Sequence, residues 1–398
     1  MGIKKRISGL GRNVFFTGLV SLFMDISSEM VYPLVPLFLT NVLGASKTIV
    51  GVIEGIAEAT ASLLKIISGW LSDRFGKRKL LMTIGYGTSA ASRPILAVAM
   101  TSTHVLGARF IDRLGKGIRT APRDAIIAES TEVGNLGLAY GFHRSMDTIG
   151  AIIGPAIAVA LLYFFRNDMR LVFLASTIPG VIAVLLITFF IREKKKAVTE
   201  SIRIPSLSIS EFNGAFRHYL TVIAVFSIGN FADAFLILKA ESVGVAKEYI
   251  PAIYLAFNII YAASSIPMGA LADKIGIKKM LILSFIVYSA VYAGVATAST
   301  PLHIWLLFPA YGLYRGMSDG SQKAYLALIS PTERKATAFG AYHAVTGLML
   351  LPASIIAGYL WDSSGPSATF IYGSIMSALA VVIFVGWGRT GRQKQEKT

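Results

Sequence analysis

Two stretches of this chain are versions of one another, and their spacing constrains the fold more than any other feature. Residues 69–79 read GWLSDRFGKRK, and residues 269–279 read GALADKIGIKK. Their glycines and their aspartate recur at an offset of 200 residues, close to half of the 398-residue chain. Two further pairs keep this offset, namely His143 with His343 and Arg123 with Lys323. The chain therefore reads as one unit written twice.

The composition places the repeated unit in a membrane. Mean hydropathy is +0.62, and 15% of the residues are charged, whereas a soluble domain has about 25%. A spanning helix needs roughly 20 apolar residues, so twelve use about 240 and leave short loops and one linker. We therefore predict an all-α membrane protein with twelve transmembrane helices in two pseudo-symmetric six-helix bundles. Such repeats are typical of transporters with a site between the halves.

The apolar runs give the predicted order along the chain. An N-terminal bundle covers 1–191, a cytoplasmic linker 192–217 and a C-terminal bundle 218–398. The helices are expected over 13–40, 48–72, 80–101, 103–127, 138–165, 169–191, 218–241, 248–272, 280–298, 303–330, 336–361 and 367–388.

The net charge of +16 reflects topology and does not indicate nucleic-acid binding. Lys and Arg crowd the two ends of the chain and every second loop, and such loops are cytoplasmic. Both termini are therefore expected inside, with the surplus charge facing anionic lipid headgroups. The chain has no cysteine, which excludes disulfide and thiol chemistry. It has no P-loop and no H-E-x-x-H motif, so we expect neither an enzyme nor a bound cofactor.

The loop at 69–79 fits the pattern G-x-L-x-D-R-x-G-x-R-K, which resembles the signature loop of the major facilitator superfamily. The weaker copy at 269–279 is also typical of that superfamily. The resemblance implies alternating access, in which two six-helix halves rock about a central site. It also implies gating contacts at this loop, and the alternative is that the loop only sets topology. The predicted gating residues are Gly69, Asp73, Arg74, Gly76, Arg78 and Asp273.

The first helix carries two acids on one face. Asp25 and Glu29 are four residues apart, with Tyr32 close by. An ionised carboxylate in hydrocarbon costs at least ~2.5 kcal/mol, so both must meet water or cations. We predict proton coupling at Asp25 and Glu29 and a substrate contact at Tyr32; the alternative is a structural pair with arginines of the fourth or fifth helix. Glu58 has a predicted transport role, or it packs as part of a Glu–Lys set.

The helix over 103–127 carries a cationic stripe. Six residues fall within an arc of about 120° at helical spacing, namely Arg109, Asp112, Arg113, Lys116, Arg119 and Arg123. The run from Arg113 to Gly117 resembles an R-x-x-x-G motif of the superfamily, with Lys116 where glutamine is common. We predict that Lys116, Arg119 and Arg123 attract an anion or zwitterion. Alternatively, Asp112 pairs with Arg109 or Arg113 while the inner arginines snorkel to the cytoplasm.

The fifth helix combines titratable and small residues. His143 and Asp147 are four apart, and we predict that they relay protons, with Arg144 facing substrate. Asp147 in a structural pair with Arg123 or Arg144 is the alternative. The run from Gly150 through Gly154 and Pro155 resembles the G-x-x-x-G-P motif of antiporters, but Ala158 and Val159 replace its last two glycines. This partial match favours export over uptake.

The second half repeats the theme more sparsely. Asp233, Arg315, Asp319 and Lys323 are the predicted substrate contacts there, with an Arg315–Asp319 ion pair as the alternative. Helix over 336–361 keeps His343 but has Gly347 where the first half has Asp147.

These features predict a monomeric secondary transporter in the inner membrane. It would move a small anionic, zwitterionic or metal-chelating molecule by proton-coupled export. Uptake by symport is one alternative, and another is transport of a divalent metal bound by Asp25, Glu29, Glu58 and His143. A membrane receptor that does not transport is a more remote reading.

Overall fold

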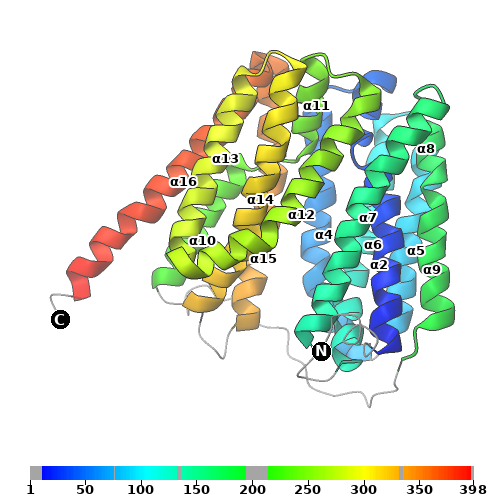
Figure 1. Ribbon diagram of the computed structural model, residues 1–398, viewed down its shortest axis with the longest axis horizontal. Helices are drawn as coiled ribbons and strands as arrows, with labels where there is room; N and C mark the ends of the chain where they lie inside the picture. The colour runs from blue at the N-terminus through cyan, green and yellow to red at the C-terminus, as the bar shows by residue number, and fades with distance from the viewer. Residues whose placement is uncertain (1–10, 76, 132–135, 194–213, 331–334, 396–398) are drawn as a thin grey trace. The chain divides into compact units, whose positions relative to one another are not determined.

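The structure is a computed structural model that describes residues 11–75, 77–131, 136–193, 214–330 and 335–395. These residues form helices and short connections, and no strand occurs among them (Figure 1). In the N-terminal half the helices are α2 (Arg12–Val31), α3 (Val35–Leu37), η1 (Phe38–Val42), α4 (Lys47–Phe75), α5 (Arg78–Ala97), α6 (Ser102–Glu129), α7 (Leu136–Phe164), α8 (Met169–Ala175) and α9 (Thr177–Phe190).

The C-terminal half repeats this order at the same offset. Its helices are α10 (Gly214–Gly229), α11 (Ala234–Ser242), η4 (Lys247–Tyr249), α12 (Ile250–Ile275), α13 (Ile277–Thr297), α14 (Pro301–Ile329), α15 (Lys335–Ser364) and α16 (Pro366–Gln395). Gly44 and Gly244, which are 200 residues apart, both adopt a left-handed φ, of 65° and 92°. Only glycine takes that conformation readily, so the sequence repeat extends to the backbone of a turn.

The chain divides into two compact units. Unit 1 contains residues up to Leu43 and from Thr60 to Ile204, and unit 2 contains Gly44–Ala59 and the rest of the chain. α4 therefore contributes its first turns to unit 2 and its later turns to unit 1. In unit 2 the carboxylate of Asp362 caps the start of α4, because it accepts hydrogen bonds from the backbone N–H groups of Lys47 and Thr48 at 3.1 and 2.8 Å. A carboxylate is favourable at this positive helix end.

Eight helical segments of the described chain are long and apolar enough to cross a membrane. They are Arg12–Val42, Phe142–Phe164, Met169–Phe190, Gly214–Ser242, Lys247–Ile275, Ile277–Thr297, Ala338–Ser364 and Pro366–Gly386. Four other long helices, α4, α5, α6 and α14, are absent from this set. They hold many of the buried polar and charged side chains, among them Glu54, Arg93, Asp112 and Gln322. The hydropathy of these four helices is low because they carry polar and charged side chains, which are also the candidates for a functional role.

The first spanning segment of each half is broken, where the sequence predicted continuous helices. In unit 1, α2 ends at Val31 and α3 begins at Val35, next to Pro33 and Pro36. Proline lacks the N–H that would continue the helical hydrogen bonds, which accounts for this break. In unit 2 the helix is interrupted between Gly229 and Ala234 without any proline.

Each unit has a packed interior. In unit 1 the largest described apolar cluster joins α2, α5, α6 and α9, and includes Met24, Met82, Tyr86 and Ile187. In unit 2 the interior is rich in aromatic rings, with Tyr288 and Tyr292 stacked at 4.0 Å between centroids. Both interiors form the frame that holds the polar side chains described next.

Candidate functional site

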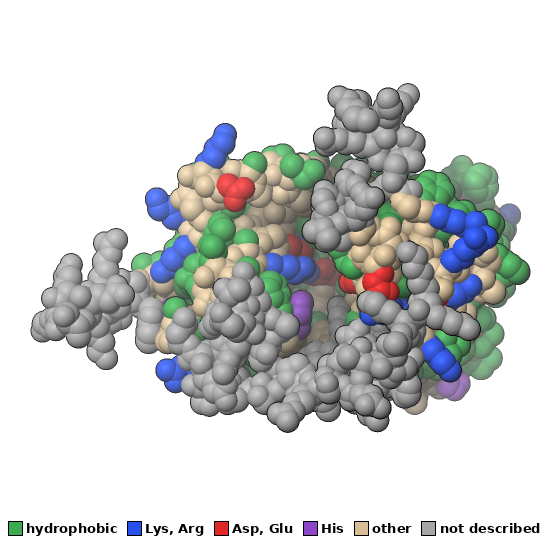
Figure 2. Space-filling view, turned by 90° about the horizontal axis from the view of Figure 1, so that it is seen from below, with side chains coloured by type: hydrophobic (Ala, Val, Ile, Leu, Met, Phe, Trp, Pro, Cys, Tyr) green, Lys and Arg blue, Asp and Glu red, His purple; other side chains and the backbone are tan. Residues whose placement is uncertain are grey.

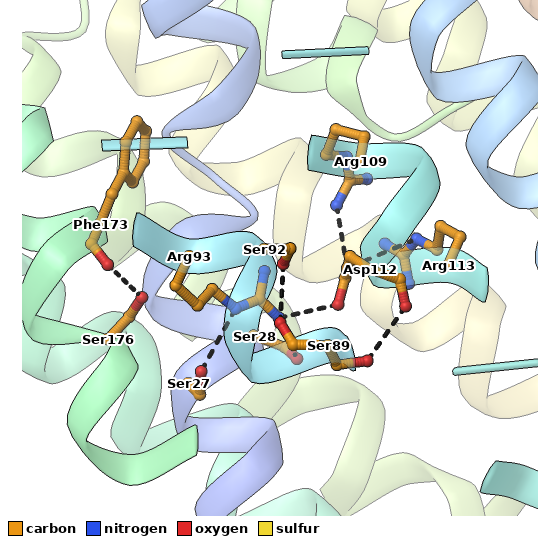
Figure 3. A network of polar contacts seen from close by, with 10 residues as sticks. All are labelled: Ser27, Ser28, Ser89, Ser92, Arg93, Arg109, Asp112, Arg113, Phe173 and Ser176. Carbon is orange, nitrogen blue, oxygen red and sulfur yellow. Dashed lines mark hydrogen bonds and ion pairs between the residues drawn. The ribbon is translucent and has the colours of Figure 1, made fainter. Parts of the chain in front are cut away.

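One buried cluster in unit 1 gathers three arginines around Asp112 (Figure 3). Arg93 of α5, which is 1% exposed, reaches the carboxylate of Asp112 on α6 at 3.0 Å. Arg109 and Arg113 lie farther from the same carboxylate, at 3.7 and 4.0 Å. The guanidinium of Arg93 also donates to Ser27 and Ser28 of α2, at 3.3 and 3.0 Å. This cluster ties α2, α5 and α6 together.

For Arg109, Asp112 and Arg113, the first part of the cationic stripe, the cluster agrees with the alternative that these residues form a structural pair. The sequence offered Arg109 or Arg113 as the partner of Asp112, but the shortest contact comes from Arg93 on a different helix. Because these groups are buried and face one another, they fit a structural role better than direct contact with a solute. Arg109 also lies over the ring of Tyr32, with 5.6 Å from its guanidinium carbon to the ring centroid. Tyr32 is thereby placed beside the cluster.

The lower part of the stripe is arranged differently. Arg119 is buried and lies over the ring of Tyr86 on α5, 4.4 Å from the centroid. α5 and α6 can approach this closely because Gly85 and Gly115 have no side chains: a Cβ on Gly85 would lie 2.7 Å from the Cβ of Arg119. The Nη1 atom of Arg119 and the hydroxyl of Tyr86 are both buried without a hydrogen-bond partner among the described residues. These two groups retain hydrogen-bonding capacity in the interior.

The two acids of α2 face α7. A Cβ on Gly150 would lie 2.8 Å from the Cβ of Asp25, and one on Gly154 would lie 2.8 Å from the Cβ of Glu29. The two glycines thus let α7 press against α2 at the turns that carry the acids. The charged groups that act on the Asp25 carboxylate are Asp147, Glu29, Lys116 and Arg119. Predicted proton-coupling acids and predicted substrate-binding cations therefore meet in one region of unit 1.

A file of polar groups continues from this region along α7. The Nδ1 atom of His143 lies 3.6 Å from a carboxylate oxygen of Asp147. Its Nε2 atom lies 2.8 Å from the hydroxyl of Ser21 on α2. Arg123 of α6 reaches that hydroxyl at 3.4 Å and binds Asp124 at 2.9 Å. His143 and Asp147 are brought together as predicted, while Ser21 was not singled out from the sequence.

In unit 2 the polar groups collect around the interrupted helix. Asp233, at the start of α11, accepts a hydrogen bond from the hydroxyl of Tyr311 at 2.7 Å. Arg315 of α14 donates to both carboxylate oxygens of Asp233, at 3.1 Å each. The backbone N–H of Ala232, freed by the interruption, donates to Ser354 on α15 at 3.2 Å. The sequence offered Asp319 as the partner of Arg315, but the structure pairs Arg315 with Asp233.

A second polar group of unit 2 is built from tyrosines. Asp319 accepts a hydrogen bond from the hydroxyl of Tyr261 at 2.7 Å. Tyr342 donates to the side-chain oxygen of Gln322 at 2.5 Å, and Gln322 donates to Ser318 at 2.7 Å. The two phenols come from α12 and α15, and each binds a different side chain of α14. Sequence analysis missed Tyr261 and Tyr342, although both contact α14, the helix that carries the predicted Arg315 and Asp319.

The remaining predicted residues differ in how far they are exposed. Lys116 and Glu58 are half-buried, whereas Arg144 and Lys323 are exposed. At the signature loop, Arg78 pairs with Glu129, and its backbone N–H donates to Glu193. Asp273 is exposed. The side chains of Gly69, Asp73, Arg74 and Gly76 lie outside the described residues.

Comparison with known proteins identifies the fold. A family model described as Major Facilitator Superfamily matches residues 17–238 and 219–398. The chain belongs to this superfamily of transporters. An uncharacterized MFS-type transporter of Methanocaldococcus jannaschii is 36% identical over 382 residues, covering 94% of this chain and 95% of that protein. The prediction of a transporter rather than an enzyme is confirmed, as is the all-helical, multi-pass membrane class.

More distant relatives agree. A protein of Lactococcus lactis described as a multi-drug resistance efflux pump PmrA homolog is 26% identical over 365 residues, covering 88% of this chain and 89% of that protein. A mutant of the nucleoside transporter NupG has a similar structure, with a TM-score of 0.80 and 13% identity over 94% of this chain and 99% of that one. A bacterial homolog of the lysosomal transporter Spinster gives a TM-score of 0.77 with 13% identity over 95% and 96%. At such identities the structural likeness establishes the fold alone.

Proposed function

We propose that this chain is a proton-coupled exporter of a small molecule that carries a negative or zwitterionic group. The observation that carries the proposal is the meeting of acids and bases in unit 1, where Asp147, Glu29, Lys116 and Arg119 all act on Asp25. Carboxylates held inside a membrane protein are expensive, and they are typical of proton relays and substrate paths. The cations beside them supply the complementary charge that an anionic group needs.

We further infer the topology that this function requires. Adding the four polar helices α4, α5, α6 and α14 to the eight apolar segments gives twelve spans, with both termini in the cytoplasm and the chain in the inner membrane as a monomer. Lys and Arg side chains are spread over the described surface in Figure 2, in keeping with a cytoplasmic face under the positive-inside rule. The site residues remain those predicted in unit 1, together with Asp233, Arg315 and Asp319 in unit 2.

Export is the preferred direction for two reasons. The close approach of α7 to α2 uses Gly150 and Gly154, which belong to the antiporter-like motif, and one relative is described as a multi-drug efflux pump homolog. Uptake by symport is the alternative, since one region of unit 1 holds both acids and cations and would bind a proton and an anion together. Among the described residues no group of three or more His, Asp or Glu side chains could hold a metal ion, which favours an organic solute over a divalent metal.

The test begins with a ligand-stabilisation screen of the purified protein against small anions, zwitterions, drug-like molecules and divalent metals. A stabilising compound is then supplied to proteoliposomes with a pH gradient and an internal pH indicator. We expect the compound to move with counterflow of protons, and both fluxes to fall to the level of empty liposomes in Asp25→Asn. A compound flux that does not change with the pH gradient would contradict proton coupling. Movement of the compound and protons in the same direction would instead indicate uptake by symport.

A further inference from the structure

Ser21 occupies a position that no part of the proposed function requires. It lies on α2, one turn before Asp25, and is 2% exposed. Two side chains reach its hydroxyl from different helices: His143 of α7, with Nε2 at 2.8 Å, and Arg123 of α6, with Nη1 at 3.4 Å. A buried serine held between an arginine and a histidine couples the hydrogen bonds of the two side chains.

The donors and acceptors limit how these bonds run. A guanidinium has only donors, so Arg123 donates, and the Ser21 oxygen accepts with one of its two lone pairs. This donation polarises the Ser21 O–H group, which favours donation of the hydroxyl proton to Nε2 of His143. A neutral imidazole that accepts at Nε2 carries its proton on Nδ1, and Nδ1 lies 3.6 Å from Asp147. The order serine, histidine, aspartate is that of a hydrolase triad, but here the serine oxygen already accepts a bond from an arginine.

We propose that Ser21 is a positioning residue that transmits the position of Arg123 to the His143–Asp147 pair. While Arg123 donates to Ser21, the imidazole presents N–H to Asp147 and stabilises the ionised carboxylate. When Arg123 swings away from Ser21, the hydroxyl is free to reverse and accept from Nε2–H. Nδ1 is then an acceptor, and it suits a protonated Asp147 that donates its own O–H.

The proton balance of this change is simple. The Nδ1 proton passes to Asp147, which becomes a neutral carboxylic acid, while one proton from solution ends on Nε2. The imidazole therefore stays neutral, and the net change is the uptake of one proton. Arg123 has a second partner ready, since it already binds Asp124 at 2.9 Å.

The surroundings of His143 are compatible with such a switch. The charged groups that act on the ring are Arg123 and Asp124 from α6 and Asp147 and Arg144 from α7, while α2 contributes only the neutral Ser21 among the contacts described. One carboxylate oxygen of Asp147 is buried with no hydrogen-bond partner among the described residues. Asp147 therefore has spare accepting capacity, and His143 is its closest described partner.

The second half shows what the arrangement looks like without the switch. At the offset of 200 residues, Ser21 corresponds to Thr221, Arg123 to Lys323 and Asp147 to Gly347. Thr221 is exposed, and its hydroxyl donates to the backbone of Arg217 at 3.1 Å. Thr221→Ala is therefore a matched control that removes a hydroxyl from the same place in the repeat.

The experiment reads the tautomer of His143 directly. The full-length protein is labelled with ¹⁵N-histidine, and the His143 signals are assigned by comparison with His143→Gln. We expect wild type and Thr221→Ala to show one neutral form with its proton on Nδ1. In Ser21→Ala and in Arg123→Ala we expect both tautomers, a loss of preference of about tenfold, as removal of one hydrogen bond predicts. Ser21→Thr should restore the single form.

The inference rests on the proposed function only for its effect on proton flux. The tautomer of His143 tests the inference, and proton flux in wild type tests the proposed function. A His143 that carries its proton on Nε2 in wild type, or an Nδ1 preference unchanged in Ser21→Ala, would overturn the inference whatever the protein transports. Thermal unfolding of each variant identifies any that fails to fold, and Arg123→Ala then provides an independent test. In proteoliposomes, Ser21→Ala should keep ligand stabilisation but reduce proton flux about tenfold; wild-type flux in that variant would equally overturn it. Absence of proton flux in wild type would instead refute the proposed function.

Discussion

The two units share a sequence repeat at an offset of 200 residues, but their buried polar groups differ in kind. In unit 1 charged groups face one another: Arg93 reaches Asp112 at 3.0 Å, and Arg109 and Arg113 lie 3.7 and 4.0 Å from the same carboxylate. Unit 2 places phenols against ions: Tyr311 donates to Asp233 and Tyr261 to Asp319, both at 2.7 Å. The positions matching Asp25, Glu29 and Asp112 hold Val225, Gly229 and Gly312.

This difference separates two tasks that a duplicated transporter needs. Ionised groups inside a membrane protein are expensive, so the meeting of Asp25, Glu29 and Asp147 in one region of unit 1 fits proton handling there. A phenol donates a hydrogen bond without carrying charge near neutrality and offers a flat ring to a solute. Unit 2 is therefore the better candidate for recognising the uncharged part of a substrate, and unit 1 for its charge and for the protons.

The comparison predicts its largest contrast at the two central carboxylates. Asp112→Ala leaves Arg93 buried without the carboxylate it faces, which should destabilise the protein by about 3–5 kcal/mol. Asp233→Ala should cost only about 1–2 kcal/mol, because the Arg315 side chain is 28% exposed and water can solvate it. Thermal unfolding in detergent, followed by tryptophan fluorescence, measures both. Equal losses would show that the two units do not differ in the way described.

The second prediction concerns the packing of α2 on α7, where Gly150 and Gly154 are matched in unit 2 by Leu350 and Ser354. Gly150→Ala would place a Cβ 2.7 Å from the carbonyl oxygen of Leu22, and such overpacking costs about 1–3 kcal/mol. It should also impair proton flux, because it moves α2 and its acids away from Asp147. The control is Gly87→Ala on α5, where nothing lies within 4 Å of the added carbon and a gain of up to ~1 kcal/mol is expected. If Gly150→Ala is destabilised but keeps its proton flux, the close packing of α2 on α7 is not needed for proton coupling, and the prediction is wrong.

These contrasts also show where the sequence was informative. Helical spacing predicted the stripe of α6 and the meeting of His143 with Asp147, because residues three and four apart share a face. It could not predict partners on different helices: no local pattern pairs Arg93 with Asp112, and none marks Ser21. Likewise, Arg119 turns to Tyr86 because Gly85 and Gly115 let two helices approach, a property of packing and not of periodicity.

A similar limit applied to helix continuity. The break beside Pro33 follows from the missing N–H of proline, a signal that the sequence contains. The interruption between Gly229 and Ala234 depends on Ser354, far along the chain, which accepts a hydrogen bond from the freed N–H of Ala232. A hydrogen bond between segments 122 residues apart leaves no trace in local propensity, so only the structure reveals it.

The third prediction tests whether the phenols of unit 2 hold their acids in place. Tyr311 is 1% exposed, and Tyr311→Phe removes its hydrogen bond to Asp233 while keeping the ring. We expect a loss of about 1.5 kcal/mol, the lower end for a bond to a charged group. Tyr359→Phe, at a tyrosine of α15 that is 63% exposed, serves as the control in the same unfolding assay. A negligible loss would mean that Arg315 alone is sufficient to position Asp233.

The smallest effect is expected at Tyr261, and it bears most directly on recognition. Tyr261 and Asp319 are both half-buried, so water replaces much of the bond removed by Tyr261→Phe, and the loss of stability should be only about 0.5–1 kcal/mol. The variant nevertheless frees the Asp319 carboxylate from its phenol. If unit 2 recognises the uncharged part of a solute, compounds that donate hydrogen bonds should gain stabilising power relative to wild type, while the proton flux of unit 1 stays intact. A drop in proton flux without any change in the compounds preferred would assign proton handling to unit 2 as well, and the division of tasks between the units would fail.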